Sequence, residues 1–230
     1  MASTEVYSSP EAALADIRGL MSRSGRFLSL SGLSGVWAGA CALAAAGYAY
    51  ARAGVTPLSG VDYYTAYYRQ YQDAAAIEPF VFALGVATMV AALAGAAFFT
   101  LRRARATGYQ LWSATSRQLL SALVWPLAAG GLLVLAHWRH GDYGYSAAIT
   151  LIFYGLALLS ASRLLVPEIR ALGYCEVALG LLVAFFPAYG IDAWAVGFGV
   201  LHVAYGLVMW RRYERLGSRG TRGRHGGLKT

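Results

Sequence analysis

Six apolar windows, each about 18 to 24 residues long, restrict most strongly what this chain can fold into. They cover residues 27–50, 80–101, 119–136, 145–162, 172–189 and 193–210. A helix of about 20 residues crosses a hydrocarbon layer of roughly 30 Å. In lipid only helices and closed barrels satisfy their own backbone groups, and these windows lack the alternating pattern of barrel strands. The sequence therefore predicts an all-α membrane protein with six transmembrane helices in one domain, 27–212.

The basic residues predict the orientation of these helices. With six spans and a cytoplasmic N-terminus, 16 of the 19 lysines and arginines lie on the cytoplasmic side, in agreement with the positive-inside rule. Only Arg52, Arg69 and Arg139 remain outside. Topology thus accounts for the net charge of +8, and we expect both termini in the cytoplasm and no nucleic-acid partner.

Two polar segments flank the spans. In residues 1–26, Ser9 is a suitable N-cap, Pro10 suits the first helical position, and apolar residues then recur at helical spacing. We expect an amphipathic helix on the cytoplasmic face, either as an anchor or as a docking site for a protein partner. Residues 213–230 lack an apolar period, which predicts a basic disordered tail attracted to anionic lipids. RNA binding by its Arg-Gly pairs is an alternative.

The first window and the two cysteines bear on signal-peptide cleavage and on disulfide or metal binding. The stretch "ALAAAG" at 42–47 resembles a signal-peptide cleavage site, but the apolar window is longer than a signal peptide requires. Cys41 and Cys175 lie in separate windows, where free cysteine behaves as a small apolar residue. We expect no disulfide, metal site or cofactor.

The connection over residues 51–79 is long and rich in tyrosine. Its stretch "VDYYTAYYRQYQDA" places five tyrosines at helical spacing, and tyrosine prefers the membrane interface. An interfacial helix and a lid over an external opening are both consistent with this pattern. Pro79 suits the start of the second transmembrane helix.

Small residues recur every four positions in the first window. Ser31, Gly35 and Gly39 share one helix face, and such a face lets two membrane helices approach closely. We expect this face to pack within the chain; a homodimer contact is the alternative.

The last two windows contain an acid and a histidine in related settings. Residues 176–183, "EVALGLLV", align with residues 202–209, "HVAYGLVM", so that Glu176 matches His202. If the two helices form an antiparallel hairpin, Glu176 faces Gly206 and His202 faces Gly180. The two polar residues then differ in depth by roughly 6 Å at 1.5 Å per residue, a gap that their side chains can bridge.

Three roles are open for this pair, because ionisable groups in a bilayer are costly unless paired and often functional. They can form a structural hydrogen bond that fixes the hairpin, a ligand or proton site, or, through His202, a haem-binding position. Arg163, at the inner end of the fourth window, is another candidate partner for Glu176.

Two resemblances accompany these features. The segment "LGYCEVALGLLVAFFPAYGIDAWAVGFGVLHVAYGLVMWRRYER" is similar to the glycine-punctuated helix pairs of the HdeD-like family, which implies a bacterial inner-membrane protein associated with acid resistance. The stretches "IRGLMSRSGRFLSLSGLSG" and "GFGVLHVAYGLVMWRRYER" resemble a group of uncharacterised bacterial six-helix membrane proteins. Neither resemblance implies a catalytic residue or a ligand.

Three function classes follow. The sequence contains no nucleophile motif, phosphate loop or redox cysteine pair, which favours a non-enzymatic regulatory, stress-related or accessory subunit, with a protein partner or a second copy. A small proton-linked transporter or channel using Glu176 and His202 is the alternative, with Pro126 as a candidate helix break. A haem- or quinone-binding redox subunit is the third class.

Overall fold

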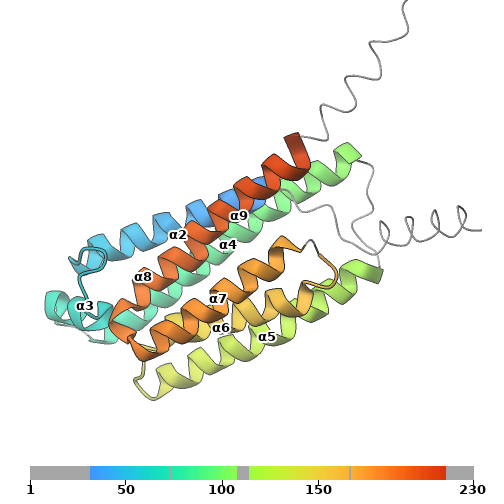
Figure 1. Ribbon diagram of the computed structural model, residues 1–230. Coiled ribbons are helices and arrows are strands. Elements are labelled where there is room, and N and C mark those ends of the chain that lie inside the picture. Colours follow the sequence, from blue (N-terminus) through green and yellow to red (C-terminus); the bar gives the residue numbers. More distant parts are fainter. Residues whose placement is uncertain (1–31, 73, 108–113, 166, 216–230) are drawn as a thin grey trace, which may run out of the picture.

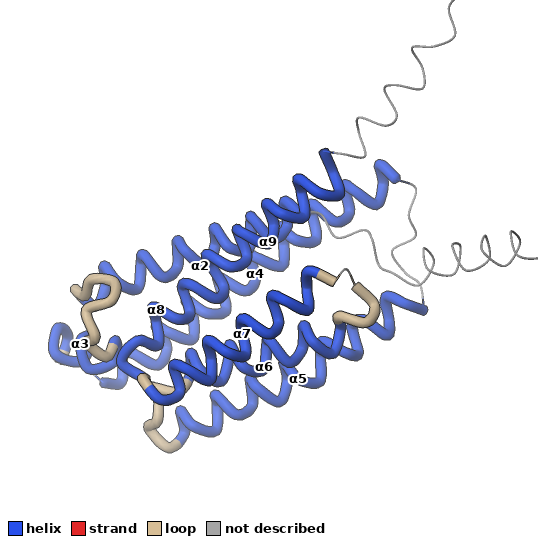
Figure 2. The backbone as a smooth tube through the Cα atoms, viewed as in Figure 1, coloured by secondary structure: helices blue, strands red, loops and turns tan. Residues whose placement is uncertain are grey.

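In the computed structural model the chain forms an elongated bundle of helices, described over residues 32–72, 74–107, 114–165 and 167–215. These residues contain helices and loops but no strand (Figure 2). The elements are α2 (Gly32–Ala53), α3 (Tyr63–Tyr71), α4 (Ala74–Thr107), α5 (Ala114–Arg139), α6 (Ser146–Ala161) and α7 (Glu168–Phe185). After the short turn η1 (Pro187–Tyr189) come α8 (Gly190–Trp194), η2 (Ala195–Leu201), α9 (His202–Met209) and η3 (Trp210–Arg215). These last four run on without interruption, and we call residues 190–215 the C-terminal helix.

The long helices sort into two groups. In the α2 group, α2 packs against both α4 and the C-terminal helix, although α2 and α9 lie far apart in the sequence. In the α6 group, α6 packs between α5 and α7. The groups meet mainly where α6 and α7 touch the C-terminal helix, whereas α4 and α5 make no extensive contact. Figure 1 shows α2, α4 and α9 together above α5, α6 and α7.

Glycines set the closest helix contacts in each group. A Cβ atom at Gly206 would lie 2.5 Å from the Val36 backbone nitrogen of α2, and one at Gly39 would lie 2.6 Å from the Gly199 carbonyl oxygen. In the α6 group, a Cβ at Gly155 would lie 2.7 Å from the Gly173 carbonyl oxygen. Close backbone approach at small residues is how membrane helices associate without a hydrophobic driving force between them.

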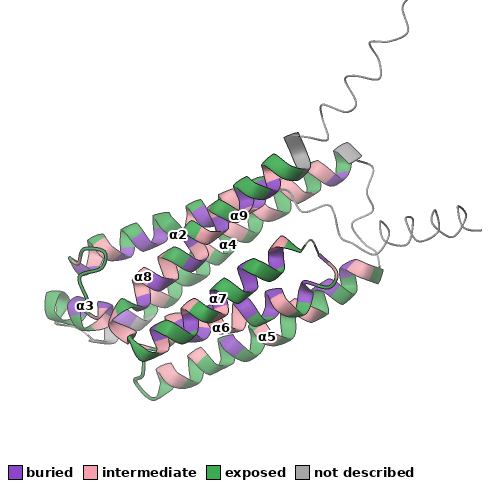
Figure 3. Cartoon of the chain, in the orientation of Figure 1, coloured by how far each residue is buried: buried purple, intermediate pink, exposed green. Residues whose placement is uncertain are grey.

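Four helical stretches are long and apolar enough to cross a membrane. They are Gly32–Ala53, Pro79–Arg105, Ala114–Arg139 and Pro187–Arg212. Ser146–Ala161 is apolar but shorter. Large apolar side chains such as Phe185, Trp125 and Leu132 are 81%, 75% and 69% exposed, and exposed positions follow the outward faces of the helices in Figure 3. An apolar exterior of this kind suits lipid, so the chain is a helical membrane protein.

Two expectations about prolines differ from the structure. Pro79 does not start the second long helix, because α4 begins at Ala74 and includes the proline. Pro126 lies inside α5 and does not break it. Among the described residues the backbone instead widens to a π-helix in two stretches, η2 just before His202 and η3 after Met209. Such π-turns occur often at functional sites.

The tyrosine-rich connection folds as the short helix α3 at one end of the bundle. Asp62 caps it, its Oδ1 accepting a hydrogen bond of 2.8 Å from the Thr65 backbone nitrogen. Tyr63 and Tyr67 are buried against α2 and the start of α4, whereas Tyr68 is exposed. Some tyrosines of α3 therefore pack against the bundle, and others lie on its surface. The predicted helix over 1–26 and Ser31 lie outside the described residues, as does the tail from residue 216 onward.

Candidate functional site

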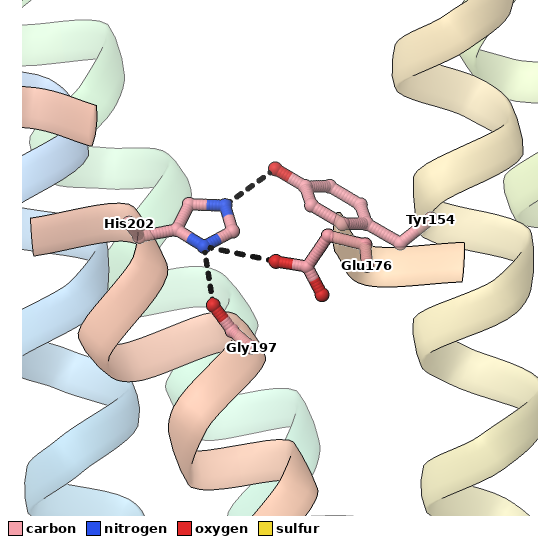
Figure 4. A network of polar contacts seen from close by, with 4 residues as sticks. All are labelled: Tyr154, Glu176, Gly197 and His202. Carbon is pink, nitrogen blue, oxygen red and sulfur yellow. Dashed lines mark hydrogen bonds and ion pairs between the residues drawn. The ribbon is translucent and has the colours of Figure 1, made fainter. Parts of the chain in front are cut away.

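The acid and the histidine singled out in the sequence lie together where the two helix groups meet. Glu176 lies on α7, and Tyr154, on α6, is beside it; both helices belong to the α6 group. His202 and Gly197 come from the C-terminal helix of the α2 group. Figure 4 shows the side chains of Tyr154, Glu176 and His202 pointing toward one another. The four residues therefore form a network that bridges the groups.

His202 is held at both ring nitrogens. Its Nδ1 lies 3.0 Å from the carbonyl oxygen of Gly197, and because a carbonyl only accepts, Nδ1 carries the proton of this bond. Its Nε2 lies 2.7 Å from the hydroxyl of Tyr154, which donates to Nε2 when the ring is neutral. Phe198 stacks on the imidazole at 5.9 Å between ring centroids. The partners thus fix both the orientation of the ring and its tautomer.

The carboxyl group of Glu176 is buried, and its oxygens lack hydrogen-bond partners in the described part of the chain. The residue is 0% exposed, and neither carboxyl oxygen has a hydrogen-bond partner among the described residues. The Oε1 atom lies 3.6 Å from His202 Nδ1, which is too long for a hydrogen bond. Buried polar groups nearly always have partners, so an orphaned carboxyl group calls for an explanation such as a functional role.

Gly197 makes room for this carboxyl group. A Cβ atom at position 197 would collide with Leu151 Cδ2 and would lie 2.6 Å from Glu176 Oε2. The same residue gives its carbonyl oxygen to His202. The site thus depends on a glycine within the π-helical stretch as well as on its two ionisable side chains.

The glycines expected to face these residues lie elsewhere. A Cβ at Gly180 would meet Ile152 and the Ala148 carbonyl oxygen on α6, and one at Gly206 would meet α2. The predicted pairing of Glu176 with Gly206 and of His202 with Gly180 is therefore wrong. The reason is that α7 packs mainly on α6 and the C-terminal helix mainly on α2, so Gly180 faces α6 and Gly206 faces α2.

The remaining predicted residues have clear positions. Gly35 and Gly39 face the C-terminal helix, where a Cβ at Gly35 would lie 3.1 Å from Gly206 Cα. This face of α2 packs within the chain. Arg163 is exposed in the turn after α6, and the structure gives Glu176 no ion pair with it among the described residues.

Neither Tyr154 nor Gly197 stands out in the sequence as a site residue. Tyr154 is one aromatic residue among many in an apolar window, although a tyrosine in the middle of an apolar helix carries a hydroxyl that needs a partner. Gly197 and Gly199 stand two apart in "VGFGV", a spacing outside the four-residue pattern that indicated helix packing.

This arrangement can bind and pass a proton. Glu176 offers a carboxyl group that can take up or release a proton. The imidazole of His202 and the phenol of Tyr154 follow it, and both can accept and donate protons in hydrogen bonds. The titratable side chains that this network joins are Glu176, His202, 3.6 Å from the carboxyl oxygen, and Tyr154, 2.7 Å from His202 Nε2. The described residues contain no cluster of three or more His, Cys, Asp or Glu suited to a metal ion.

Comparisons with known proteins identify no relative of this chain. No protein family matches the chain, and neither a curated protein nor a solved structure matches it.

Proposed function

We propose that this chain is a small proton-linked transporter of the bacterial cytoplasmic membrane, with Glu176 and His202 as its proton site. The observation that carries the proposal is the orphaned carboxyl group of Glu176, 3.6 Å from His202 and contributed by the other helix group. In a bilayer, an ionisable residue facing the bundle interior is typical of proton relays.

The division of the helices suggests how a proton could drive movement. Alternating access is often a rigid-body rocking of one helix bundle against another around a central site. Here α6 and α7 contribute Tyr154 and Glu176, and the C-terminal helix contributes His202. A change in the charge of Glu176 alters its attraction to His202 and thereby the contact between the groups.

The two native cysteines allow this movement to be measured. Cys41 lies on α2 in one group and Cys175 on α7 in the other, and the sequence contains only these 2 cysteines. Spin labels on both report the separation of the groups by electron paramagnetic resonance. We expect the distance distribution of the protein in lipid vesicles to change between acidic and alkaline pH.

Substitutions show whether Glu176 causes the change. Glu176→Gln removes the titratable group at nearly constant shape, so its distance distribution should be independent of pH. Asp142→Asn, in the exposed turn between α5 and α6, is the matched control and should respond like the wild type. An unchanged wild-type distribution, or a wild-type response in Glu176→Gln, would contradict the proposal.

The proposal includes six spans with both termini in the cytoplasm. α6 and α7 join the four longer apolar stretches as spans, because α6 packs lengthwise between α5 and α7. The arginine distribution supports the orientation. Reporter fusions at residues 60 and 225 should give external and internal signals respectively, and signals from the same side would exclude this topology.

The other function classes have less support. An accessory or regulatory role without enzymatic activity, in contact with a protein partner, remains a prediction from the absence of motifs. A haem ligand at His202 would require Nε2 to leave the hydroxyl of Tyr154, 2.7 Å away. The network across the two groups favours a proton-linked role over both.

A further inference from the structure

A cavity of about 400 Å³ opens where the two helix groups diverge. It lies toward the α3 end of the bundle and is bounded by α2, α4, α5, α6 and α8, with Asp62, Tyr63 and Tyr64 at its edge. Its lining is mostly apolar, including Val81, Met89 and Leu135. None of the Glu176, His202 and Tyr154 network lines it, so the cavity is separate from the proton site.

The dimensions of the cavity match an alkyl chain. Its lining on α4 runs from Val81 to Met89, or about 12 Å along the helix at 1.5 Å per residue. One leaflet contributes about 15 Å of hydrocarbon. Since α4 and α5 make no extensive contact, a lipid chain can enter between them from the side and lie parallel to the helices.

Two glycines keep this space open. Gly85 on α4 and Gly131 on α5 both line the cavity, and a Cβ atom added at either would meet nothing within 4 Å. They differ from the glycines that bring helices into contact, where an added Cβ would collide with a neighbouring backbone. Gly47 on α2 is equally open but does not line the cavity.

Polar groups gather at the α3 end of the cavity. The hydroxyl of Tyr63 is buried without a hydrogen-bond partner among the described residues, and the residue is only 7% exposed. Asp62 adds a carboxylate, and the described residues that line the cavity include no lysine or arginine. A hydroxyl donor suits a phosphate or ester oxygen, whereas a carboxylate suits an ammonium group.

We propose that this cavity binds one phospholipid with an ammonium-bearing head group. One acyl chain lies between α4 and α5, the Tyr63 hydroxyl donates to a phosphate or ester oxygen, and Asp62 attracts the ammonium group. An anionic head group lacking an ammonium group fits less well, because Asp62 repels it. The site stands independently of the proposed transport activity.

Binding to the purified full-length protein tests the proposal. The protein is delipidated in mild detergent and titrated, in native mass spectrometry, with dioleoyl phosphatidylethanolamine and with dioleoyl phosphatidylglycerol. We expect the first phosphatidylethanolamine to bind about tenfold more tightly, the scale of one charge-assisted contact. Equal affinities, or tighter binding of phosphatidylglycerol, would overturn the head-group assignment.

Glycine substitutions locate the acyl chain. Gly85→Leu and Gly131→Leu each place a side chain in the open space and should weaken binding of both lipids at least tenfold. Gly47→Leu adds the same side chain outside the cavity and should bind like the wild type. Equal effects of the three substitutions would show that lipid covers only the general surface and would refute the cavity site. Circular dichroism verifies that each variant is folded.

Two smaller substitutions test the polar end. Asp62→Asn keeps the helix cap, because asparagine caps as well as aspartate, and should abolish the preference for phosphatidylethanolamine. Tyr63→Phe removes only the hydroxyl and should weaken both lipids. A preference retained in Asp62→Asn, or unchanged affinities in Tyr63→Phe, would refute the assigned contacts.

Discussion

Replacing Glu176 with methionine should make the protein more stable. Methionine has a similar length and needs no hydrogen bond, so Glu176→Met removes two buried carboxyl oxygens that lack partners. A buried polar group without a partner costs about 1 to 3 kcal/mol. The lost attraction to His202, whose Nδ1 lies 3.6 Å from Oε1, offsets part of this gain. We expect a net increase of about 1 to 2 kcal/mol in the free energy of unfolding.

Unfolding in mixed detergent measures this change. The protein in mild detergent is titrated with sodium dodecyl sulfate and followed by circular dichroism, and the midpoint and slope give the unfolding free energy. Leu172→Met is the matched control: Leu172 is 7% exposed on the same helix, and this swap changes no polar group. Such volume-conserving swaps cost less than about 1.5 kcal/mol.

The outcome separates a structural from a functional role for Glu176. A protein that keeps an unfavourable buried acid for its activity gains stability when the acid is removed. If Glu176 instead fixes the helices together, Glu176→Met should lose stability, as expected when one partner of a buried pair is removed. A loss greater than about 1 kcal/mol would therefore refute the reasoning.

Three further predictions concern packing and the α3 end. Gly206→Ala should lose about 1 to 3 kcal/mol of unfolding free energy in the same assay, because its Cβ would lie 2.5 Å from an α2 backbone nitrogen. The control Gly47→Ala, whose Cβ would meet nothing within 4 Å, should lose no stability. Equal losses in the two variants would contradict this explanation. Burial raises the pKa of Tyr64 to about 12, so the folded protein holds this proton when the unfolded chain has lost it, and stability should fall between pH 10 and 12 by at most about 1.4 kcal/mol per pH unit. An alkaline unfolding curve unchanged in Tyr64→Phe would show that another group is responsible. Asp192→Ala should lower the free energy of unfolding by about 1.5 to 3 kcal/mol. The reason is that Asp192 Oδ1 accepts hydrogen bonds from the Tyr50 hydroxyl at 2.6 Å and the Leu58 backbone nitrogen at 2.9 Å. A variant whose stability is within about 0.5 kcal/mol of wild type, the range of neutral surface changes, would exclude this bridging role.

The helical membrane fold could be predicted because long apolar windows leave a chain few alternatives. The windows at 80–101 and 119–136 lie within α4 and α5. Their ends were less accurate, since α4 begins at Ala74 and contains Pro79. A proline inside a helix loses one hydrogen bond, and polar neighbours or local adjustment can compensate in a membrane protein, so the residue type alone does not set the boundary.

The site was only partly predictable, for a reason of packing. Internal similarity drew attention to Glu176 and His202, and the structure brings both to one network. The predicted facing glycines failed because helices adjacent in sequence were assumed to be each other's main packing partners. Which helices pack together depends on contacts such as Gly206 against Val36, far apart in sequence, and on a π-helical stretch that no periodic pattern in the sequence indicates.

The pairing of α2 with the C-terminal helix has a consequence for biosynthesis. α5, α6 and α7 follow one another in sequence and can pack together as soon as they have been synthesised. α2 is the least apolar of the four span-length stretches, and its glycine face packs against the C-terminal helix, which is synthesised after α3 to α7. Until the C-terminal helix has been synthesised, α2 must remain in lipid or at the insertion machinery without this partner. Chains that stop before the C-terminal helix would therefore leave α2 poorly inserted and exposed to membrane proteases.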